Sequence, residues 1–570
     1  MRRGLLVLLL LTVAVLPSKV WGAEGYSIDN ADTYQITEHS VCKLVTNALA
    51  AGKGLYVPTK YNTEWSSGAK AFINNAIIGV SLADCLDAAS LRFKSASSTY
   101  LSRTGTAGNR KTFTWSAWVK RSAIAPGEMF SGYIDANNFS IITLDGNHQV
   151  QYYNLVAATG RAYITSAGVL RDPSAWYHIV VSVDATTGFG RIYINGVDQT
   201  VTGVAPGNYD SAFNTTVAQN VGRRGNGTTY FDGYVADMYL IDGQALPPSA
   251  FAETNSFTGQ WIPKPYAGTY GTNGVHLTFG NAASLGADSS GGAKNWTANN
   301  FSTTVGTTYD PMIDYPSGTL PALNAAAWGN YATWNPLNAS SIMGLTGGNL
   351  TATATGTAAW RSVVATIGAS SGKWYWELTA GPHGGANHYM PGIAQLTFAT
   401  SGVNHPGNDA VSYGYYGNTG GRYPSNVAYG AAYTTGNIIG VALDLDNGKL
   451  FFSKDGVWQN SGNPVAGTNP AVSGLTGTWQ PAIGTYNGSG MTANFGQGAF
   501  IYSPPSGFKP LTTYNFLAPA INKGEDYFKT VTYTGNGIFR SIARRRNFLA
   551  AQTSQIQCCS AEQDSTLPRR

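Results

Sequence analysis

Two carboxylates in one short stretch come nearest, by type and spacing, to a catalytic pair. Asp444 and Asp446 lie two residues apart within residues 436–458, GNIIGVALDLDNGKLFFSKDGVW, and side chains with that spacing on a strand project from one face. Retaining glycoside hydrolysis needs two carboxylates about 5 Å apart, and on a strand it would show Glu-x-Asp-x-Glu spacing. That run is absent, and Asp446 abuts a turn beside Lys449. We therefore expect both carboxylates to lie on the solvent side of a scaffold strand.

Other signatures of catalysis are also missing from the sequence. It contains no G-x-S-x-G nucleophile elbow, no H-E-x-x-H zinc motif and no phosphate-binding loop. The cysteines lack a second Cys/His pair at the spacing of metal ligands. We therefore predict that the protein is not an enzyme, with no catalytic residue, no metal site and no cofactor.

A tyrosine-rich segment at residues 381–433 is the best candidate for ligand binding. It holds seven tyrosines and three of the chain's seven histidines. Tyrosine offers a large ring surface at low entropic cost, together with a hydrogen-bonding tip, which suits recognition of proteins or sugars. The predicted contact residues are His388, Tyr389, Tyr413, Tyr415, Tyr416, Tyr423 and Tyr429. Simple packing of loops explains the composition equally well, and a histidine-based metal site is less favoured because no adjacent carboxylate pair supports it.

The composition indicates an all-β protein with several domains. A chain of 570 residues has room for roughly three or four domains. Charged residues make up 11%, well below the usual ~25%, whereas the 69 glycines are matched by 69 aromatic residues, as in short strands joined by turns. Most of the net charge of +5 comes from residues 540–570, with six arginines against two acidic residues. The remainder is nearly neutral, so we expect no nucleic-acid-binding surface on the folded part.

The stretch at 436–458 predicts antiparallel strands joined by tight turns. Asn447-Gly448 is typical of a two-residue type I′ turn, which would set Asp446 opposite Lys449. Strand alternation then gives one apolar face and one more polar face. The apolar face would hold Val441, Leu443, Leu445, Leu450 and Phe452. The stretch therefore reads as a sheet that lines the core of a sandwich.

The same pattern of strands and turns occurs twice in the chain. Asp455-Gly456 predicts a second turn after the first hairpin, and residues 176–199 repeat the sequence of apolar strand, acidic end, turn and strand. There Asn195-Gly196 predicts another two-residue hairpin. Two separate sandwiches are therefore expected.

Residues 91–261 resemble the laminin-G-like, concanavalin-type jelly rolls. The motifs that carry the resemblance are WSAWVK, WYHIVVSVD, RIYINGV and YFDGYVADMYLIDGQALPPSAF, and they look especially like versions found in tail and other virion proteins of bacteriophages. Some relatives bind calcium or sugar at one rim of the sandwich. Asp145-Gly146-Asn147 could supply oxygen ligands for Ca²⁺, although a hairpin turn is the favoured interpretation.

Residues 330–516 closely resemble a SPRY domain. The motifs GKWYWEL, GVALDLDNGKLFFSKDGVW, NFGQGAF and PPSGF follow one another in that order. The resemblance implies a bent β-sandwich that binds proteins or other ligands through loops at one end and has no catalytic residues. We expect Trp374 and Trp376 to lie in the core rather than on a ligand platform.

The N-terminal region predicts export. Residues 1–22 resemble a secretory signal peptide, with two arginines, an apolar run, and residues of small or moderate size at the −3 and −1 positions of the cleavage site. The apolar run is too short for a comfortable membrane span. In residues 23–88, Cys42 and Cys85 suggest a disulfide in a small module, which would contribute roughly 3–4 kcal/mol. Two unpaired buried thiols are the alternative.

The predicted fold is thus two jelly-roll sandwiches in tandem, at 89–262 and 326–517. A connector rich in Gly, Ser, Thr and Asn joins them at 263–325; part of it alternates like a strand, and we expect it to pack partly on the first sandwich. The tail at 518–570 ends without alternation or turns and is interpreted as irregular, truncated or frame-shifted.

The leading functional prediction is a non-enzymatic recognition, adhesion or virion structural protein. It would bind a cell-surface glycan or protein through loops of the sandwiches, with other virion proteins as further partners and oligomer formation open. The signal peptide predicts an extracellular location, whereas virion proteins assemble in the cytoplasm. The alternatives are a secreted bacterial carbohydrate-binding adhesin and, less favoured, a glycan hydrolase of the concanavalin-like fold.

Overall fold

The computed structural model describes residues 90–516, apart from 257, 317–328 and 357, together with 521 and 523. These residues form β-strands, turns and four short 3-10 helices, and they contain no α-helix. The predicted all-β fold is therefore confirmed. Within the same residues, no helix combines the length and the apolar character that crossing a membrane requires.

Three predictions lie outside the described residues. They concern the signal peptide at 1–22, the Cys42–Cys85 disulfide, and the truncated end of the tail beyond residue 523. All three stay predictions.

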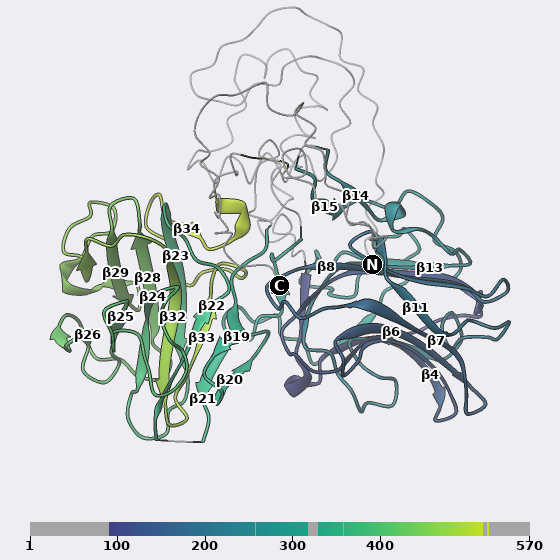
Figure 1. Ribbon diagram of the computed structural model, residues 1–570, viewed down its shortest axis with the longest axis horizontal. Helices are drawn as coiled ribbons and strands as arrows, with labels where there is room; N and C mark the ends of the chain where they lie inside the picture. The colour runs from purple at the N-terminus through teal and green to yellow at the C-terminus, as the bar shows by residue number, and fades with distance from the viewer. Residues whose placement is uncertain are drawn as a thin grey trace, which may run out of the picture. The chain divides into compact units, whose positions relative to one another are not determined.

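The first sandwich consists of two β-sheets whose apolar faces meet (Figure 1). One sheet has the order β10-β9-β8-β3-β13-β1-β18, with β16 beside β13. Its strands are β1 (Ser90–Phe93), β3 (Thr112–Arg121), β8 (Tyr177–Asp184), β9 (Phe189–Ile194), β10 (Val197–Asp198), β13 (Gly233–Asp242), β16 (Val275–Leu277) and β18 (Pro311–Met312). The other has the order β11-β7-β6-β5-β4-β12-β2-β17. Its strands are β2 (Tyr100–Thr104), β4 (Gly127–Asp135), β5 (Asn138–Leu144), β6 (Gln149–Val156), β7 (Thr159–Val169), β11 (Thr200–Val204), β12 (Ala218–Val221) and β17 (Thr297–Asn299). A separate pair, β14 (Ala252–Thr254) and β15 (Trp261–Pro263), follows β13.

Strand β3 shows how the sequence pattern positions this core. Phe113 and Trp115 alternate along the strand and are fully buried between the sheets. Trp118 breaks the alternation and points to the other face of β3, away from Phe113 and Trp115. It is buried there as well, because its ring stacks on that of His178, with centroids 4.9 Å apart. The central strand is therefore covered on both faces.

The predicted turn after β9 is confirmed. Asn195 and Gly196 both have positive φ, 50° and 81°, and Ile194 pairs with Val197. Two consecutive left-handed residues define the type I′ turn, whose twist matches that of the strands it joins.

The connector contributes strands to the first sandwich, since β16 pairs with β13, β17 with β2 and β18 with β1. Two aspartates near the end of the connector form ion pairs with buried basic side chains. Asp310 lies 3.1 Å from Arg92, and Asp314 lies 2.9 Å from Lys120, with no side chain of the four more than 1% exposed. Removing one partner of such a pair typically costs about 3–5 kcal/mol. The two ion pairs therefore hold the end of the connector against β1 and β3.

The second sandwich also has two sheets (Figure 1). The seven-stranded sheet has the order β19-β22-β32-β24-β25-β26-β27. Its strands are β19 (Trp334–Ala339), β22 (Trp360–Ala365), β24 (Tyr389–Gln395), β25 (Ser412–Tyr415), β26 (Gly421–Tyr423), β27 (Val427–Ala428) and β32 (Trp479–Tyr486). The nine-stranded sheet has the order β20-β21-β33-β23-β28-β29-β30, with β31 beside β29 and β34 beside β23. Its strands are β20 (Met343–Thr346), β21 (Thr351–Ala354), β23 (Lys373–Ala380), β28 (Ile438–Asp444), β29 (Lys449–Lys454), β30 (Val457–Trp458), β31 (Val472–Ser473), β33 (Gly490–Asn494) and β34 (Lys509–Pro510).

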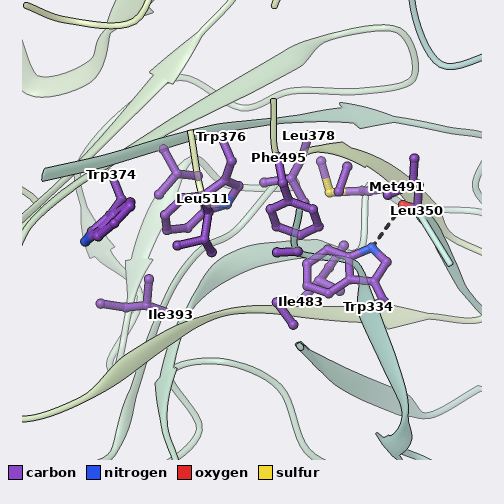
Figure 2. Packing of buried hydrophobic residues seen from close by; sticks show 14 of the residues in the cluster. Trp334, Leu350, Trp374, Trp376, Leu378, Ile393, Ile483, Met491, Phe495 and Leu511 are labelled. Atoms are coloured by element: carbon purple, nitrogen blue, oxygen red, sulfur yellow. Dashed lines mark hydrogen bonds between the residues drawn. The ribbon is translucent and has the colours of Figure 1, made fainter. Parts of the chain in front are cut away.

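Large apolar rings fill the space between these sheets (Figure 2). Trp334 and Trp376 are fully buried, and the indole N–H of Trp334 donates to the carbonyl of Leu350 at 3.0 Å. Trp374 is 3% exposed and stacks on Phe516. The prediction that Trp374 and Trp376 belong to the core is confirmed.

The hairpin of β28 and β29 differs from its predicted register by two residues. Asp444, rather than Asp446, pairs with Lys449. A shift of two residues leaves every side chain on the same face, so Val441 still lies in the core, where it pairs with Phe452. The apolar face was therefore predicted correctly although the register was wrong.

The turn at Asn447-Gly448 accounts for the shift. Residues 445–448 form a four-residue loop in which Gly448 has positive φ and Asn447 does not. The Asp444 carboxylate accepts the Asn447 backbone N–H at 3.0 Å and its side-chain amide at 2.9 Å, a local bonding that favours the wider loop over the type I′ turn. The turn predicted at Asp455-Gly456, by contrast, is confirmed, and it is type I′ because Asp455 and Gly456 both have positive φ.

The face of β28 and β29 that was predicted to be more polar is buried too. Phe451 and Ala442 are fully buried and form a small cluster with Tyr375 and Phe508. The segment around Phe508 covers this face from the far end of the domain sequence, and strand alternation alone cannot reveal such a cover.

The two candidate catalytic carboxylates do not form a pair. Asp444 is 1% exposed and binds the Lys373 ammonium at 3.0 Å, whereas Asp446 lies in the exposed loop and accepts the Gly372 N–H at 2.6 Å. The expectation that both face solvent from one strand face is wrong. A buried Asp444 and a loop Asp446 do not match the paired carboxylates that flank a glycosidic bond.

We expect Asp444→Asn to destabilise the protein by about 1–3 kcal/mol, because it leaves part of a buried hydrogen-bonded cluster unsatisfied. Burial alone would raise the pKa of Asp444, but hydrogen bonds from Asn447 and Lys373 outweigh it and hold the pKa below its usual value. The ionised form is therefore favoured by folding, and its stabilisation is present above the unfolded pKa of about 4 and is lost as pH falls through the lower folded pKa.

Urea unfolding of the wild type and Asp444→Asn between pH 3 and 7 measures this contribution. The unfolding free energy of the wild type should exceed that of Asp444→Asn by the largest amount near pH 7, and this difference should shrink toward pH 3. Asp446→Asn is the matched control and should change stability much less. A difference that is constant with pH, or equal for both variants, contradicts the assignment.

Candidate functional site

The outer face of the seven-stranded sheet is lined by small residues where strands β22, β32, β24 and β25 lie side by side. A Cβ atom on Gly484 would come within 2.5 Å of the His405 Cβ, and one on Gly414 within 2.6 Å of the Pro406 carbonyl oxygen. Ser362 on β22 donates to the carbonyl of Asn404 at 2.8 Å. These small side chains let the segment between β24 and β25 lie directly on the sheet.

A group of aromatic rings gathers at one end of this face, which we call the aromatic patch. Its members are Trp360, His388, His405, Tyr416, Tyr423 and Tyr486. Trp360 is central, since its ring centroid lies 4.6 Å from that of His405 and 5.8 Å from those of Tyr416 and Tyr486. All members except His405 are partly exposed.

Strand ends position these rings. Trp360 begins β22 and pairs with Tyr486, which ends β32. His388 immediately precedes β24, and Tyr416 immediately follows β25. Because neighbouring strands here are antiparallel, the start of one and the end of the next meet at the same edge of the sheet. Residues from four separate parts of the sequence thus form one surface.

The patch carries hydrogen-bonding groups but little charge. His388 Nδ1 lies 2.6 Å from the hydroxyl of Tyr416. Burial lowers the pKa of His388, and the nearby His383 lowers it further, while burial also lowers the pKa of His405. Burial raises the pKa of Tyr416. At neutral pH the rings are therefore uncharged, and the arrangement suits recognition by contact and hydrogen bonding rather than acid–base chemistry.

The structure brings together three of the seven predicted contact residues, His388, Tyr416 and Tyr423. Tyr389 and Tyr415 are fully buried in the core and offer no surface to a ligand. Strand alternation explains this, because each is adjacent in sequence to a patch residue and so faces the opposite side.

The remaining two predicted contacts support the fold. Tyr413 stacks against Trp479, with centroids 5.7 Å apart, and the hydroxyl of Tyr429 accepts the N–H of Phe452 at 3.2 Å. Three patch members were missed: Trp360, His405 and Tyr486. His405 lay within the tyrosine-rich segment, but no sequence signal connects Trp360 or Tyr486 with that segment, because pairing across the sheet is what unites them.

Metal binding has no support at either candidate position. Among the described residues, no group of three or more His, Cys, Asp or Glu side chains could hold an ion. At the predicted Ca²⁺ position, Asp145 Oδ1 accepts the backbone N–H groups of Asn147 and Gln149, each at 2.9 Å. This carboxylate oxygen serves the turn, which was the favoured interpretation, and calcium binding stays the untested alternative.

Comparison with protein families matches two segments of the chain. Residues 94–250 match the concanavalin A-like lectin/glucanases superfamily, and residues 373–498 match the SPRY domain. The two matches coincide with the first and second sandwiches.

Curated relatives include Ran-binding protein 9 of Xenopus tropicalis, which is 30% identical over 184 residues, or 30% of this chain and 31% of that protein. The Ran-binding proteins 9/10 homolog of Drosophila melanogaster is 29% identical over 177 residues, covering 29% of this chain and 17% of that protein. The chain therefore spans less than a third of the length of these relatives.

Solved structures include the SPRY domain of human HERC1, with 17% identity and a TM-score of 0.24, covering 28% of this chain and 96% of that one. A heptameric SAP-like pentraxin from Limulus polyphemus has 17% identity and a TM-score of 0.22, covering 28% and 77%. The two family matches show that the chain carries a concanavalin-like domain followed by a SPRY domain.

Proposed function

We propose that this protein is a non-enzymatic recognition protein that binds a protein partner through the aromatic patch of its SPRY domain. The observation that carries the proposal is the convergence of six rings from separate strands on one partly exposed, uncharged surface. Aromatic anchors of this kind dominate the binding energy of many protein interfaces.

The construction of the patch favours tight recognition. Trp360 makes edge contacts with the rings of His388 and Tyr416 and tilted contacts with two further rings, so little side-chain freedom remains to be lost on binding. The hydroxyl of Tyr416 and the ring of His388 are already joined by a hydrogen bond. Amphipathic rings with a polar tip bury apolar area while still satisfying a partner's polar groups.

The comparisons support a macromolecular ligand. Five of the six patch members, all except Trp360, lie in the segment that matches the SPRY domain, and curated relatives of this chain are named as Ran-binding proteins. The extracellular or virion setting, with a cell-surface ligand, belongs to the proposal and rests on the signal-like N-terminus and the phage-type motifs. A secreted glycan-binding adhesin is the second candidate, favoured by the partly exposed Trp and Tyr rings.

The partner class is tested by presenting the purified chain to a random peptide library and to a glycan array in parallel. We expect peptides to be selected, and Trp360→Ala to weaken their binding by at least about tenfold, as for a central aromatic anchor. Trp458→Ala is the matched control, because Trp458 is also partly buried but lies on the nine-stranded sheet. It should leave binding unchanged.

Two results would contradict this assignment. Equal losses for Trp360→Ala and Trp458→Ala would indicate general destabilisation rather than a contact at the patch. Glycan binding with no selected peptide would replace the protein ligand with the adhesin alternative.

Binding of a selected peptide should also weaken on acidification from pH 7.5 to 5.5. His388 and His405 have lowered pKa values, so both are neutral at pH 7.5, and a ligand that covers the patch disfavours protonation further. Protonation therefore opposes binding, and affinity falls only as pH drops through the lowered pKa values of these histidines, which lie below the usual value of about 6.5.

Isothermal titration at several pH values measures this dependence. His388→Gln keeps a polar group without the titration and should flatten the pH profile. The titratable side chains nearest to His388 are His383, Tyr416 and Tyr486. An affinity that stays constant between pH 7.5 and 5.5 argues against a role for the histidines.

A further inference from the structure

The first sandwich carries a second, separate surface on the outer face of strands β4 to β7. The strand register places Glu128 opposite Thr143, and Thr143 opposite Gln151. On the same face, Tyr153 pairs with both Ile141 and Tyr163. A polar row and an apolar row of side chains thus run side by side across the sheet.

A hollow of about 410 Å³ lies over these rows. Its walls are Pro126, Glu128, Ile141, Thr143, Leu144, Asp145, Gln151, Tyr153, Tyr163, Arg224 and Thr229. Most of the wall surface is aliphatic or aromatic, and Tyr163 is 39% exposed at its edge. The hollow has the size for one side chain or a small ligand group, and Glu128, Thr143 and Gln151 form the polar row on one side of it.

Glu128 lines the polar end with an unsatisfied carboxylate. Its side chain is 4% exposed, and its Oε2 atom is buried without a hydrogen-bond partner. Burial raises the pKa of Glu128 to about 7, and the nearby Arg224 opposes that rise. Leaving a buried polar group unpaired is costly, and native structures seldom do so without a reason.

Arg224 lines the same end and is unsatisfied as well. Its Nε atom lies 3.6 Å from Glu128 Oε1, too far for a hydrogen bond, and is buried without a partner. The guanidinium instead lies over the ring of Phe139, 4.8 Å from its centroid. One unsatisfied acceptor and one unsatisfied donor thus belong to two neighbouring side chains that line the hollow.

The charges of this pair restrict what can bind. A cation would be repelled by Arg224, and above about pH 7, where Glu128 is mostly ionised, an anion would be repelled by Glu128. A neutral group with its own donor and acceptor meets no such repulsion and can satisfy both side chains. A carboxamide fits this description, because its N–H₂ and C=O are separate, coplanar atoms, and its aliphatic stem can lie on Ile141 and Tyr153.

We propose that the hollow on β4 to β7 binds a carboxamide side chain, Asn or Gln, presented by a partner protein. The amide N–H₂ donates to Glu128 Oε2, and the amide oxygen accepts from Arg224 Nε. This site is independent of the aromatic patch, so the first sandwich contributes its own contact to recognition.

Small probes that differ only in their polar head test the proposal on the full chain. Butyramide, butylammonium, butyrate, 1-butanol and glucose are titrated while the methyl signals of Ile141 are followed by NMR. We expect butyramide to shift these signals saturably and to bind at least about fivefold more tightly than every other probe, the worth of one additional hydrogen bond.

Variants then test the two contacts separately. Arg224→Leu, at the rim, and Glu128→Leu should each weaken butyramide by about fivefold, with unchanged methyl spectra away from the hollow as evidence of an intact fold. Trp458→Ala, on the other sandwich, should have no effect.

Three results would overturn the proposal. They are tightest binding of butylammonium or butyrate, equal binding of butyramide and 1-butanol or glucose, and the absence of saturation by butyramide. Because none of these measurements involves the aromatic patch, a failure here leaves the SPRY-domain proposal untouched.

Discussion

Opposite orientation of successive side chains along a paired strand is the constraint on which this structure depends. Backbone hydrogen bonding sets the register, and a register error of an even number of residues leaves every face intact. The hairpin of β28 and β29 shows this, because Asp444 rather than Asp446 pairs with Lys449 while the apolar residues still face the core. The same rule separates His388 from Tyr389 and Tyr416 from Tyr415, so that one member of each neighbouring pair packs inside and the other joins the aromatic patch.

Small residues decide where the patch lies. Gly484 and Gly414 leave no room for even a Cβ atom beneath the segment that carries His405 and Pro406. That segment therefore lies flat on the middle of the sheet, and large rings are confined to the edge where the strands end. The position of the proposed recognition surface thus follows from where the face of the sheet carries only small residues. The small residues that admit the covering segment thus also set where the proposed binding surface lies.

Local patterns predicted the all-β fold, the two sandwiches, and the turns at Asn195-Gly196 and Asp455-Gly456, because these depend on neighbouring residues. They failed at Asn447-Gly448, where the Asp444 side chain bonds the backbone of the turn. They also failed for the second face of β28 and β29, which Phe508 covers from a distant part of the sequence. The candidate site was predicted in part, since three of the predicted contact residues, His388, Tyr416 and Tyr423, make up half of the patch. Trp360 and Tyr486 could not be found, because they reach it only through pairing across the sheet.

Buried charge gives the sharpest contrast between structural and functional residues in a chain with 11% charged residues. Asp310 and Asp314 are paired with cations, and Glu377 accepts the N–H groups of Ile501 and Tyr502 at 2.9 and 2.8 Å. Asp444 is satisfied in the same manner. Each of these carboxylates ties a connector or loop to a strand, and its bonds explain its burial. Glu128 is equally buried, yet its Oε2 atom accepts no hydrogen bond from the described residues. Since the other buried carboxylates discussed here are retained for the bonds they make within the fold, the free oxygen of Glu128 is best explained by a bond made outside it.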